Sequence, residues 1–152
     1  MPETTTTTGP HAVIERTVDA TPTEVWPLWT DPEQFRQWYG PAGATIPTAR
    51  FDLQVGGERV VAMVVQTPGG ERTMWFRGVH VELAAGALLV YTETMTDEAG
   101  EPQSPETTVR VELEAAGAGG TLVRVTHMGL PAGSPGAAGW TMALDKLAAF
   151  VA

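Results

Sequence analysis

Three polar residues, Arg77, Glu93 and His127, lie within stretches of otherwise alternating apolar residues, where their side chains could act on a bound molecule. An arginine supplies hydrogen-bond donors in a fixed fork, and a carboxylate beside it supplies acceptors, so such a pair could hold a carbonyl or hydroxyl group. Together with His127 or Tyr91, the same groups could also move protons in acid–base catalysis. A lone histidine in an apolar stretch is more often a hydrogen-bonded structural residue than a catalyst.

Other common chemistries lack the residues that they need. The chain has no cysteine, and its three histidines, His11, His80 and His127, are scattered and match no metal-binding spacing. The glycine pairs in "VGGE" and "TPGGE" are typical of hairpin turns and lack the strand–loop–helix context of a phosphate-binding loop. Ser104 and Ser134 have no histidine nearby in the sequence, and no G-x-S-x-G motif occurs, so a catalytic triad has no support. We therefore expect no metal and no cofactor.

The composition limits the partners of the chain. Its 152 residues suit one domain with one core, and its net charge is −9. A negative surface repels nucleic-acid phosphates and anionic lipids, so we expect neither nucleic acid nor a membrane as a partner. No apolar run reaches the roughly 20 residues that span a bilayer, and the N-terminus lacks the pattern of a signal peptide. With the lack of cysteine, these features predict a cytoplasmic protein.

The elements that position the polar residues follow from periodicity. Thr21-Pro22 and Asp31-Pro32 each resemble a helix start, with a capping residue before a proline. Alternating apolar residues between turn signals predict strands, and apolar residues at helical spacing end the chain. The expected strands are Ala12–Val18, Ala49–Val55, Arg59–Gln66, Thr73–Leu83, Leu88–Met95, Thr107–Glu114 and Thr121–Met128, and the expected helices are Pro22–Thr30, Pro32–Trp38 and Ala137–Val151. Short hairpin connections make the sheet antiparallel, which predicts an α+β domain over residues 12–152 after a disordered tail at 1–11.

The stretches "TPTEVWPLWTDPEQFRQWYGP", "DLQVGGE", "FRGVHVEL", "VTHMGL" and "GWTMALDKLAAFV" follow one another along the chain. In this order they resemble the SRPBCC or START-like superfamily, and more narrowly the group described as homologues of the activator of heat shock protein 90 ATPase. The resemblance covers Ala12 to Val151. It implies a helix-grip fold, in which a seven-stranded antiparallel sheet wraps around the long C-terminal helix and leaves a cavity between them. Members of the superfamily bind lipids, hormones and other apolar molecules, and some are cyclases or aromatases.

Five aromatic residues are concentrated in the two short helices that follow the first strand. In a helix-grip fold these helices close one end of the groove. We expect Trp26, Trp29 and Phe35 to be packing residues that dock the helices. Trp38 and Tyr39, at the end of the second helix, are the better candidates for contact with a ligand.

The strand Thr73–Leu83 has two alternate sets of side chains, and only one of them can face the helix. The more apolar set includes Trp75, Val79 and Leu83, so we expect it to face inward. Arg77 belongs to the same set and would therefore also face the groove.

The strand Leu88–Met95 has two similarly apolar sets, and the family resemblance favours the set that contains Tyr91 and Glu93 as the inward one. Across the hairpin, Glu93 would then lie diagonal to Arg77, about 7–8 Å away at the backbone. Because a lone buried charge is costly, the two residues could form an inward pair; alternatively, both charges lie in water at the mouth of the groove. His127 lies in phase with apolar residues of its own strand and should face the same groove.

The resemblance and the strand phases together predict a set of residues around the cavity. The expected ligand-binding residues are Trp38, Tyr39, Met63, Trp75, Arg77, Val79, Tyr91, Glu93, His127 and Trp140. The predicted function is the binding of a small, largely apolar molecule. One alternative is an enzyme of cyclase, aromatase or hydrolase type that uses these polar groups, and another is a co-chaperone-like protein that acts on a large ATPase. A homodimer is compatible with the sequence, which points to no particular protein partner.

Overall fold

A seven-stranded antiparallel sheet forms the body of the molecule in the computed structural model, which describes residues 11–152. The strands are β1 (His11–Val18), β2 (Thr45–Phe51), β3 (Glu58–Thr67), β4 (Gly70–Ala84), β5 (Leu88–Thr96), β6 (Thr107–Ala116) and β7 (Gly120–Met128). The helices are α1 (Pro22–Thr30), α2 (Pro32–Phe35) and α3 (Pro135–Val151). The tail expected at 1–11 lies outside the described residues, except for His11, which begins β1.

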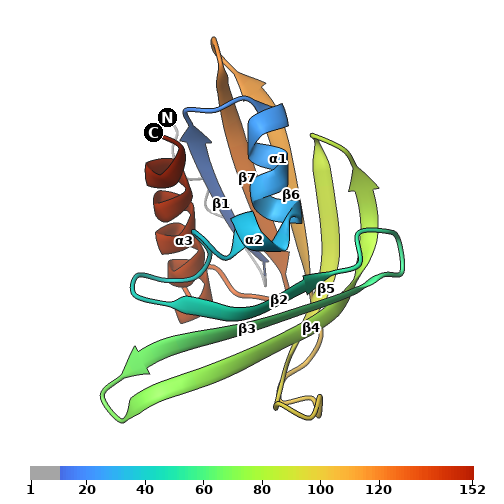
Figure 1. Cartoon of the computed structure of the whole chain (residues 1–152), viewed down its shortest axis with the longest axis vertical. Coiled ribbons are helices and arrows are strands. Elements are labelled where there is room, and N and C mark those ends of the chain that lie inside the picture. The colour runs from blue at the N-terminus through green and yellow to red at the C-terminus, as the bar shows by residue number, and fades with distance from the viewer. Residues whose placement is uncertain (1–10) are drawn as a thin grey trace.

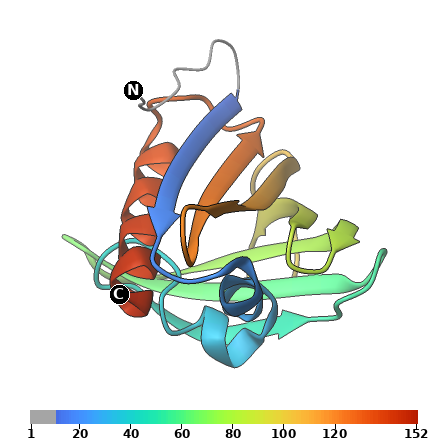
Figure 2. The ribbon, with the colours of Figure 1, turned by 90° about the horizontal axis from the view of Figure 1, so that it is seen from above.

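The strands follow the order β1-β7-β6-β5-β4-β3-β2, so β1 and β2 form the two edges. The sheet bends strongly, and α3 lies alongside β1 while α1 and α2 cover the far end of the groove (Figures 1 and 2). The predicted α+β helix-grip fold, with two short helices after the first strand, is confirmed.

Local capping explains where the helices begin. Thr21 accepts a hydrogen bond from the backbone N–H of Glu24, whose carboxylate accepts the backbone N–H of Thr21 in return. The side chain of Asp31 caps α2 by accepting a hydrogen bond from the N–H of Glu33. Ser134 caps α3, which therefore begins at Pro135, two residues before the start at Ala137 that periodicity predicted. The helix α2 is shorter than expected and ends before Trp38.

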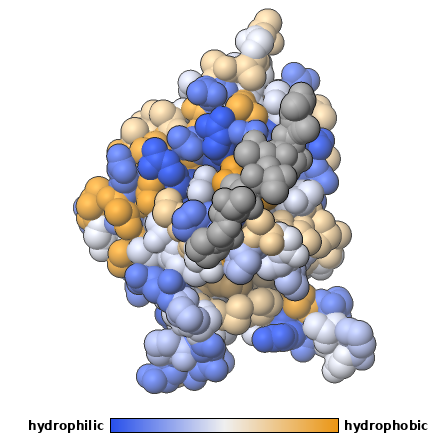
Figure 3. Space-filling model, turned by 180° about the vertical axis from the view of Figure 1, so that it is seen from behind, coloured by the Kyte–Doolittle hydropathy of each residue, from blue (hydrophilic) through white to orange (hydrophobic). Residues whose placement is uncertain are grey.

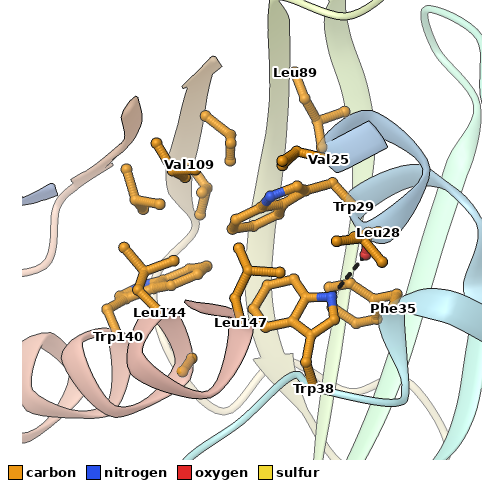
Figure 4. Packing of buried hydrophobic residues seen from close by; sticks show 14 of the residues in the cluster. Val25, Leu28, Trp29, Phe35, Trp38, Leu89, Val109, Trp140, Leu144 and Leu147 are labelled. Atoms are coloured by element: carbon orange, nitrogen blue, oxygen red, sulfur yellow. Dashed lines mark hydrogen bonds between the residues drawn. The ribbon is translucent and has the colours of Figure 1, made fainter. Parts of the chain in front are cut away.

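The core at the closed end of the groove is a cluster of aromatic rings from α1, α2 and α3 (Figure 4). The ring centroids of Trp29 and Trp38 are 4.7 Å apart, and Trp29 also stacks on Trp140 of α3 at 6.1 Å. The indole N–H of Trp38 donates to the backbone carbonyl of Leu28 at 2.8 Å. These contacts dock both short helices on the long one, as expected for Trp29 and Phe35, which are buried.

A β-bulge in β4 changes which side chains face the core. The pairing of β4 with β5 shifts by one residue between His80 and Glu82. Before the bulge, Phe76 lies on the concave face, and after it Leu83 packs against the core. The two residues are an odd number of positions apart, which a regular strand would place on opposite faces.

The surface mixes hydrophilic and hydrophobic residues, as the view from behind shows for one face (Figure 3). The large apolar residues with the highest exposure among those described are Leu53, Val55, Val79, Val81, Met142 and Phe150. Within residues 11–152, no helix has both the length and the apolar character needed to cross a bilayer.

The burial of α3 predicts a large cost for removing its core side chains. Leu144 is 1% exposed, so Leu144→Ala should lower the free energy of unfolding by about 2–5 kcal/mol, because it leaves a cavity in the core. Met142, on the outer side of the same helix, is 40% exposed, and Met142→Ala should cost less than about 1 kcal/mol. Denaturant melts of the two variants provide the comparison. Equal losses would mean that α3 does not pack through Leu144.

Candidate functional site

A cavity of about 490 Å³ lies between the concave face of the sheet and α3. Its lining is mostly apolar and comes from β3, β4, β5, β6, β7, α3 and the loops beside them. The lining residues are Tyr39, Gly40, Pro41, Met63, Val65, Met74, Phe76, Glu93, Met95, Ser104, Pro105, Thr107, His127, Gly129, Leu130, Pro135, Gly136, Gly139, Trp140 and Ala143. The described part of the chain has no cluster of His, Asp and Glu residues that could hold a metal ion.

Half of the residues predicted to bind a ligand line this cavity. They are Tyr39, Met63, Glu93, His127 and Trp140, which come from five different segments of the chain. The expected inward orientation of Glu93 and His127 is therefore correct. Contact of these residues with a ligand stays a prediction.

The expectation for β4 before the bulge is wrong, because Trp75, Arg77 and Val79 lie outside the cavity lining. The opposite set of β4 faces inward in this part of the strand, and the bulge reverses the phase further along. Arg77 instead donates hydrogen bonds to the hydroxyl of Thr96 at 3.2 Å and to the backbone carbonyl of Glu98 at 2.9 Å. The proposed inward pair of Arg77 with Glu93 is consequently wrong.

Two further residues of the predicted lining are buried in the core instead. Trp38 is 1% exposed and packs among the aromatic residues of α1 and α2. Tyr91 is fully buried, and burial raises the pKa of its hydroxyl. Neither side chain contributes to the cavity wall.

Arg59 of β3 is the buried cation that sequence reasoning missed. Only 3% of the residue is exposed, and its guanidinium lies 3.8 Å from the ring centroid of Tyr91, 4.4 Å from that of Phe51 and 5.1 Å from that of Phe35. Its two terminal nitrogens have no hydrogen-bond partner among residues 11–152. Cation–π contact with three rings thus takes the place of a paired carboxylate.

Three apolar lining residues on neighbouring strands were also missed. Met74 pairs across the sheet with Met63, and Phe76 pairs with Met95, so these residues form one continuous apolar wall. Met95 lies two positions after Glu93 in the same strand, so an inward Glu93 already implied an inward Met95. Placing Met74 and Phe76 needs the register of the hairpins, which links them to Met63 and Met95.

His127 is held by hydrogen bonds on both ring nitrogens. The indole N–H of Trp140 donates to Nδ1 at 3.0 Å, and the hydroxyl of Thr107 lies 2.8 Å from Nε2. Because an indole can only donate, Nδ1 is the acceptor and the proton of the neutral ring is on Nε2. Burial lowers the pKa of His127 to about 4, so the ring is neutral at pH 7.

Glu93 has no comparable support. Its side chain is 12% exposed, and its Oε1 lies 3.8 Å from Nε2 of His127, beyond hydrogen-bond distance. Burial raises the pKa of Glu93 to about 7, against the attraction of the Arg59 charge, which lowers it. The carboxyl group is therefore partly protonated at neutral pH and available to a ligand on the cavity side.

Lys146, the single lysine of the chain, ties α3 to the loop at the edge of the cavity. Its ammonium group donates to the backbone carbonyls of Tyr39 at 3.3 Å, of Gly40 at 3.2 Å and of Pro41 at 3.2 Å. Burial lowers the pKa of the lysine. The clamp holds the segment that carries Tyr39 against the helix.

Residues 19–152 match the family model described as Activator of Hsp90 ATPase homolog 1-like protein. The chain belongs to this family. No curated protein matches the chain significantly. The family resemblance inferred from the sequence motifs is confirmed.

Solved structures with the same fold come from several bacteria. A Chromobacterium violaceum protein has a TM-score of 0.78 at 23% identity, over 94% of this chain and 98% of that one. An AHSA1 protein from Silicibacter pomeroyi has a TM-score of 0.76 at 22% identity, over 92% and 96% of the two chains. A Nitrosomonas europaea protein has a TM-score of 0.71 at 24% identity, over 91% and 92%. At these identities the likeness shows the fold alone.

The hydrogen bond from Trp140 to His127 predicts a change in titration. Trp140→Phe removes the donor to Nδ1, which frees this nitrogen for a proton, so the pKa of His127 should rise by about one unit. Trp29→Phe is the matched control, because the buried indole N–H of Trp29 has no partner within the described residues. NMR titration of the His127 ring measures its pKa in the two variants. The same pKa in the two variants would mean that the indole does not hold the ring.

The two buried titrating groups predict opposing effects on stability. Glu93 has a folded pKa of about 7, above its ordinary 4.5, so its stabilising contribution is complete below about pH 4.5 and is lost as the pH rises through 7. His127 has a folded pKa of about 4, below its ordinary 6.5, so its contribution is present above 6.5 and is lost as the pH falls through 4. The contributions of Glu93 and His127 to the pH dependence of the free energy of unfolding therefore have opposite signs and largely cancel between about pH 4.5 and pH 6.5.

Glu93→Gln should remove the contribution of Glu93 to the pH dependence of stability. Relative to the unaltered protein, the variant should gain about 2–3 kcal/mol in free energy of unfolding between about pH 4.5 and pH 8. Glu106→Gln, at an exposed position near the cavity rim, should show no such trend. Denaturant melts across this pH range test the expectation. Parallel curves for the Glu93 variant and the unaltered protein would place the carboxyl group in solvent.

Proposed function

We propose that this protein binds a small, largely apolar molecule in the cavity between the sheet and α3. The observation that carries the proposal is the cavity itself, about 490 Å³ in volume, with apolar residues of several strands as its walls. Sites for small molecules in proteins have volumes of about 300–1,000 Å³ and a few polar groups in an apolar lining. Glu93, Tyr39 and the His127–Thr107 pair are such polar groups here.

Several features of the whole chain are compatible with a binding role in the cytoplasm. The lack of cysteine fits a reducing compartment, and the net charge of −9 argues against nucleic acid as a partner. The cavity is closed at one end by the aromatic cluster and bordered elsewhere by a loop rich in glycine and proline at 129–134. Such a loop offers few anchoring side chains, which suits a point of ligand entry.

An acid–base enzyme on the same cavity is the second candidate. It is favoured by the Glu93 carboxyl, whose pKa of about 7 suits proton transfer at neutral pH. His127 lies 3.8 Å from it, but both nitrogens of this ring are already engaged. Conversion of a bound molecule, and not only its binding, would distinguish this candidate. The co-chaperone alternative rests on the description of the family.

Filling the cavity should weaken binding strongly without harm to the fold. Gly139 of α3 lines the cavity, and a Cβ atom at this position would meet no atom within 4 Å. Gly139→Phe should place its ring in the cavity and also improve the helix, because glycine is a poor helix former. The neutral fluorescent probe N-phenylnaphthylamine, whose emission increases in apolar surroundings, should bind the unaltered protein and bind the variant at least tenfold more weakly.

Ala138→Phe is the matched control, since Ala138 is exposed on the neighbouring position of the same helix. It should bind the probe like the unaltered protein, and thermal melts should show that both variants are folded. Equal binding by all three proteins, or no binding by any, would refute a ligand site in the cavity.

A further inference from the structure

We propose that the protonated carboxyl group of Glu93 donates a hydrogen bond to a carbonyl oxygen of the ligand, which makes an uncharged, apolar ketone-like molecule the preferred occupant of the cavity. The inference rests on the proposed function and specifies the chemistry of its ligand. Most of the other polar groups of the cavity wall already make hydrogen bonds within residues 11–152, whereas the carboxyl group of Glu93 does not.

The cavity wall around His127 has no hydrogen-bond donor available to a ligand. Nδ1 of His127 accepts from Trp140, and Nε2–H is directed at Thr107 at 2.8 Å. The hydroxyl of Thr107 in turn donates a hydrogen bond to the backbone carbonyl of Glu93 at 3.1 Å. Ser104, elsewhere on the wall, accepts the N–H of Met95 and donates to a backbone carbonyl. These groups satisfy one another and leave no donor for a ligand.

The carboxyl group of Glu93 is different because neither oxygen makes a hydrogen bond within residues 11–152. It faces the cavity among apolar residues, where an ionised carboxylate without donors is unfavourable. Burial accordingly raises its pKa to about 7. An apolar site can in this way keep a carboxylic acid neutral, so that it donates a hydrogen bond to a carbonyl group.

The hydroxyl of Tyr39 offers a second donor on the same wall. It makes no hydrogen bond to another described residue, and burial together with the nearby Glu93 charge raises its pKa well above the ordinary value. The hydroxyl therefore keeps its hydrogen at every pH of interest. Two free donors facing an apolar space favour a ligand that brings an acceptor.

The surrounding charges disfavour a charged ligand. The groups that face Glu93 from neighbouring elements are the Arg59 cation of β3, the neutral tyrosines Tyr39 and Tyr91, and the neutral His127 of β7. The Lys146 ammonium of α3 lies at the rim. An ammonium ligand would add a third positive charge opposite a single carboxyl group. A carboxylate ligand would meet Glu93 in a chain of net charge −9.

Three naphthalene probes of similar size but different polar groups test this preference. Acetylnaphthalene carries a ketone, naphthylmethylamine an ammonium and naphthoate a carboxylate. Each competes with N-phenylnaphthylamine for the unaltered protein at about pH 6, where Glu93 is mostly protonated. We expect the ketone to bind at least tenfold more tightly than either charged probe.

The pH dependence shows whether Glu93 is responsible. Ionisation of a donor with a pKa of about 7 should weaken ketone binding about tenfold between pH 6 and pH 8. Glu93→Gln keeps an N–H donor that does not titrate, so it should bind the ketone with nearly constant affinity over this range. Glu106→Gln should keep the tenfold dependence, and Tyr39→Phe should keep it while binding more weakly at every pH.

Several outcomes would overturn the inference while the proposed function stands. If N-phenylnaphthylamine binds and naphthylmethylamine competes best, with an affinity that rises with pH, Glu93 acts as a carboxylate for a cation. If naphthoate competes best, Arg59 or Lys146 determines the ligand. If all three compete equally, or if Glu93→Gln retains the pH dependence, Glu93 does not contact the ligand. Failure of N-phenylnaphthylamine itself would instead refute the cavity as a ligand site.

Discussion

One helix cannot cover the whole concave face of a strongly bent, seven-stranded sheet, and most features of this protein follow from that constraint. The helix α3, residues Pro135–Val151, fills the groove beside β1 and β7, and the aromatic residues of α1 and α2 fill one end. Part of the inward surface of β3, β4 and β5 faces α3 without side chains that fill the space between them. The cavity is the space that is left there, about 490 Å³ with mostly apolar walls.

The polar groups inside this space differ in how well they are satisfied. The ring of His127 has a partner on each nitrogen, so its neutral form is held in one tautomer and orientation. Among the described residues, the terminal nitrogens of Arg59 have no hydrogen-bond partner, but three aromatic rings surround its guanidinium. The carboxyl group of Glu93 has no hydrogen-bond partner within residues 11–152 and lines the cavity. An unsatisfied group at such a place is where a ligand can gain most from a complementary polar atom.

The fold is shared with bacterial proteins that are less than 25% identical to this chain, so the fold cannot specify a ligand. Specificity has to come from the side chains of the cavity wall. In this protein the wall combines methionine and aromatic residues with one titratable carboxyl group. Methionine side chains adapt to different shapes, whereas the carboxyl group selects for polar chemistry.

The sequence by itself determined the features that depend on neighbouring residues. The caps at Thr21 and Asp31, the antiparallel hairpins and the inward phase of His127 are present as predicted, because short-range hydrogen bonds and alternation specify them. The inward phase of Glu93 is also as predicted, but it came from the family resemblance, since the two alternate sets of its strand are similarly apolar. Only the tertiary structure decided the rest. The bulge in β4, which places Arg77 and Leu83 on opposite faces although they are an even number of positions apart, depends on pairing with β5 and leaves no signal in the alternation. In β3, Val60 and Met63 are both buried although they lie on opposite faces, so a continuous apolar run could not show that Arg59 points inward.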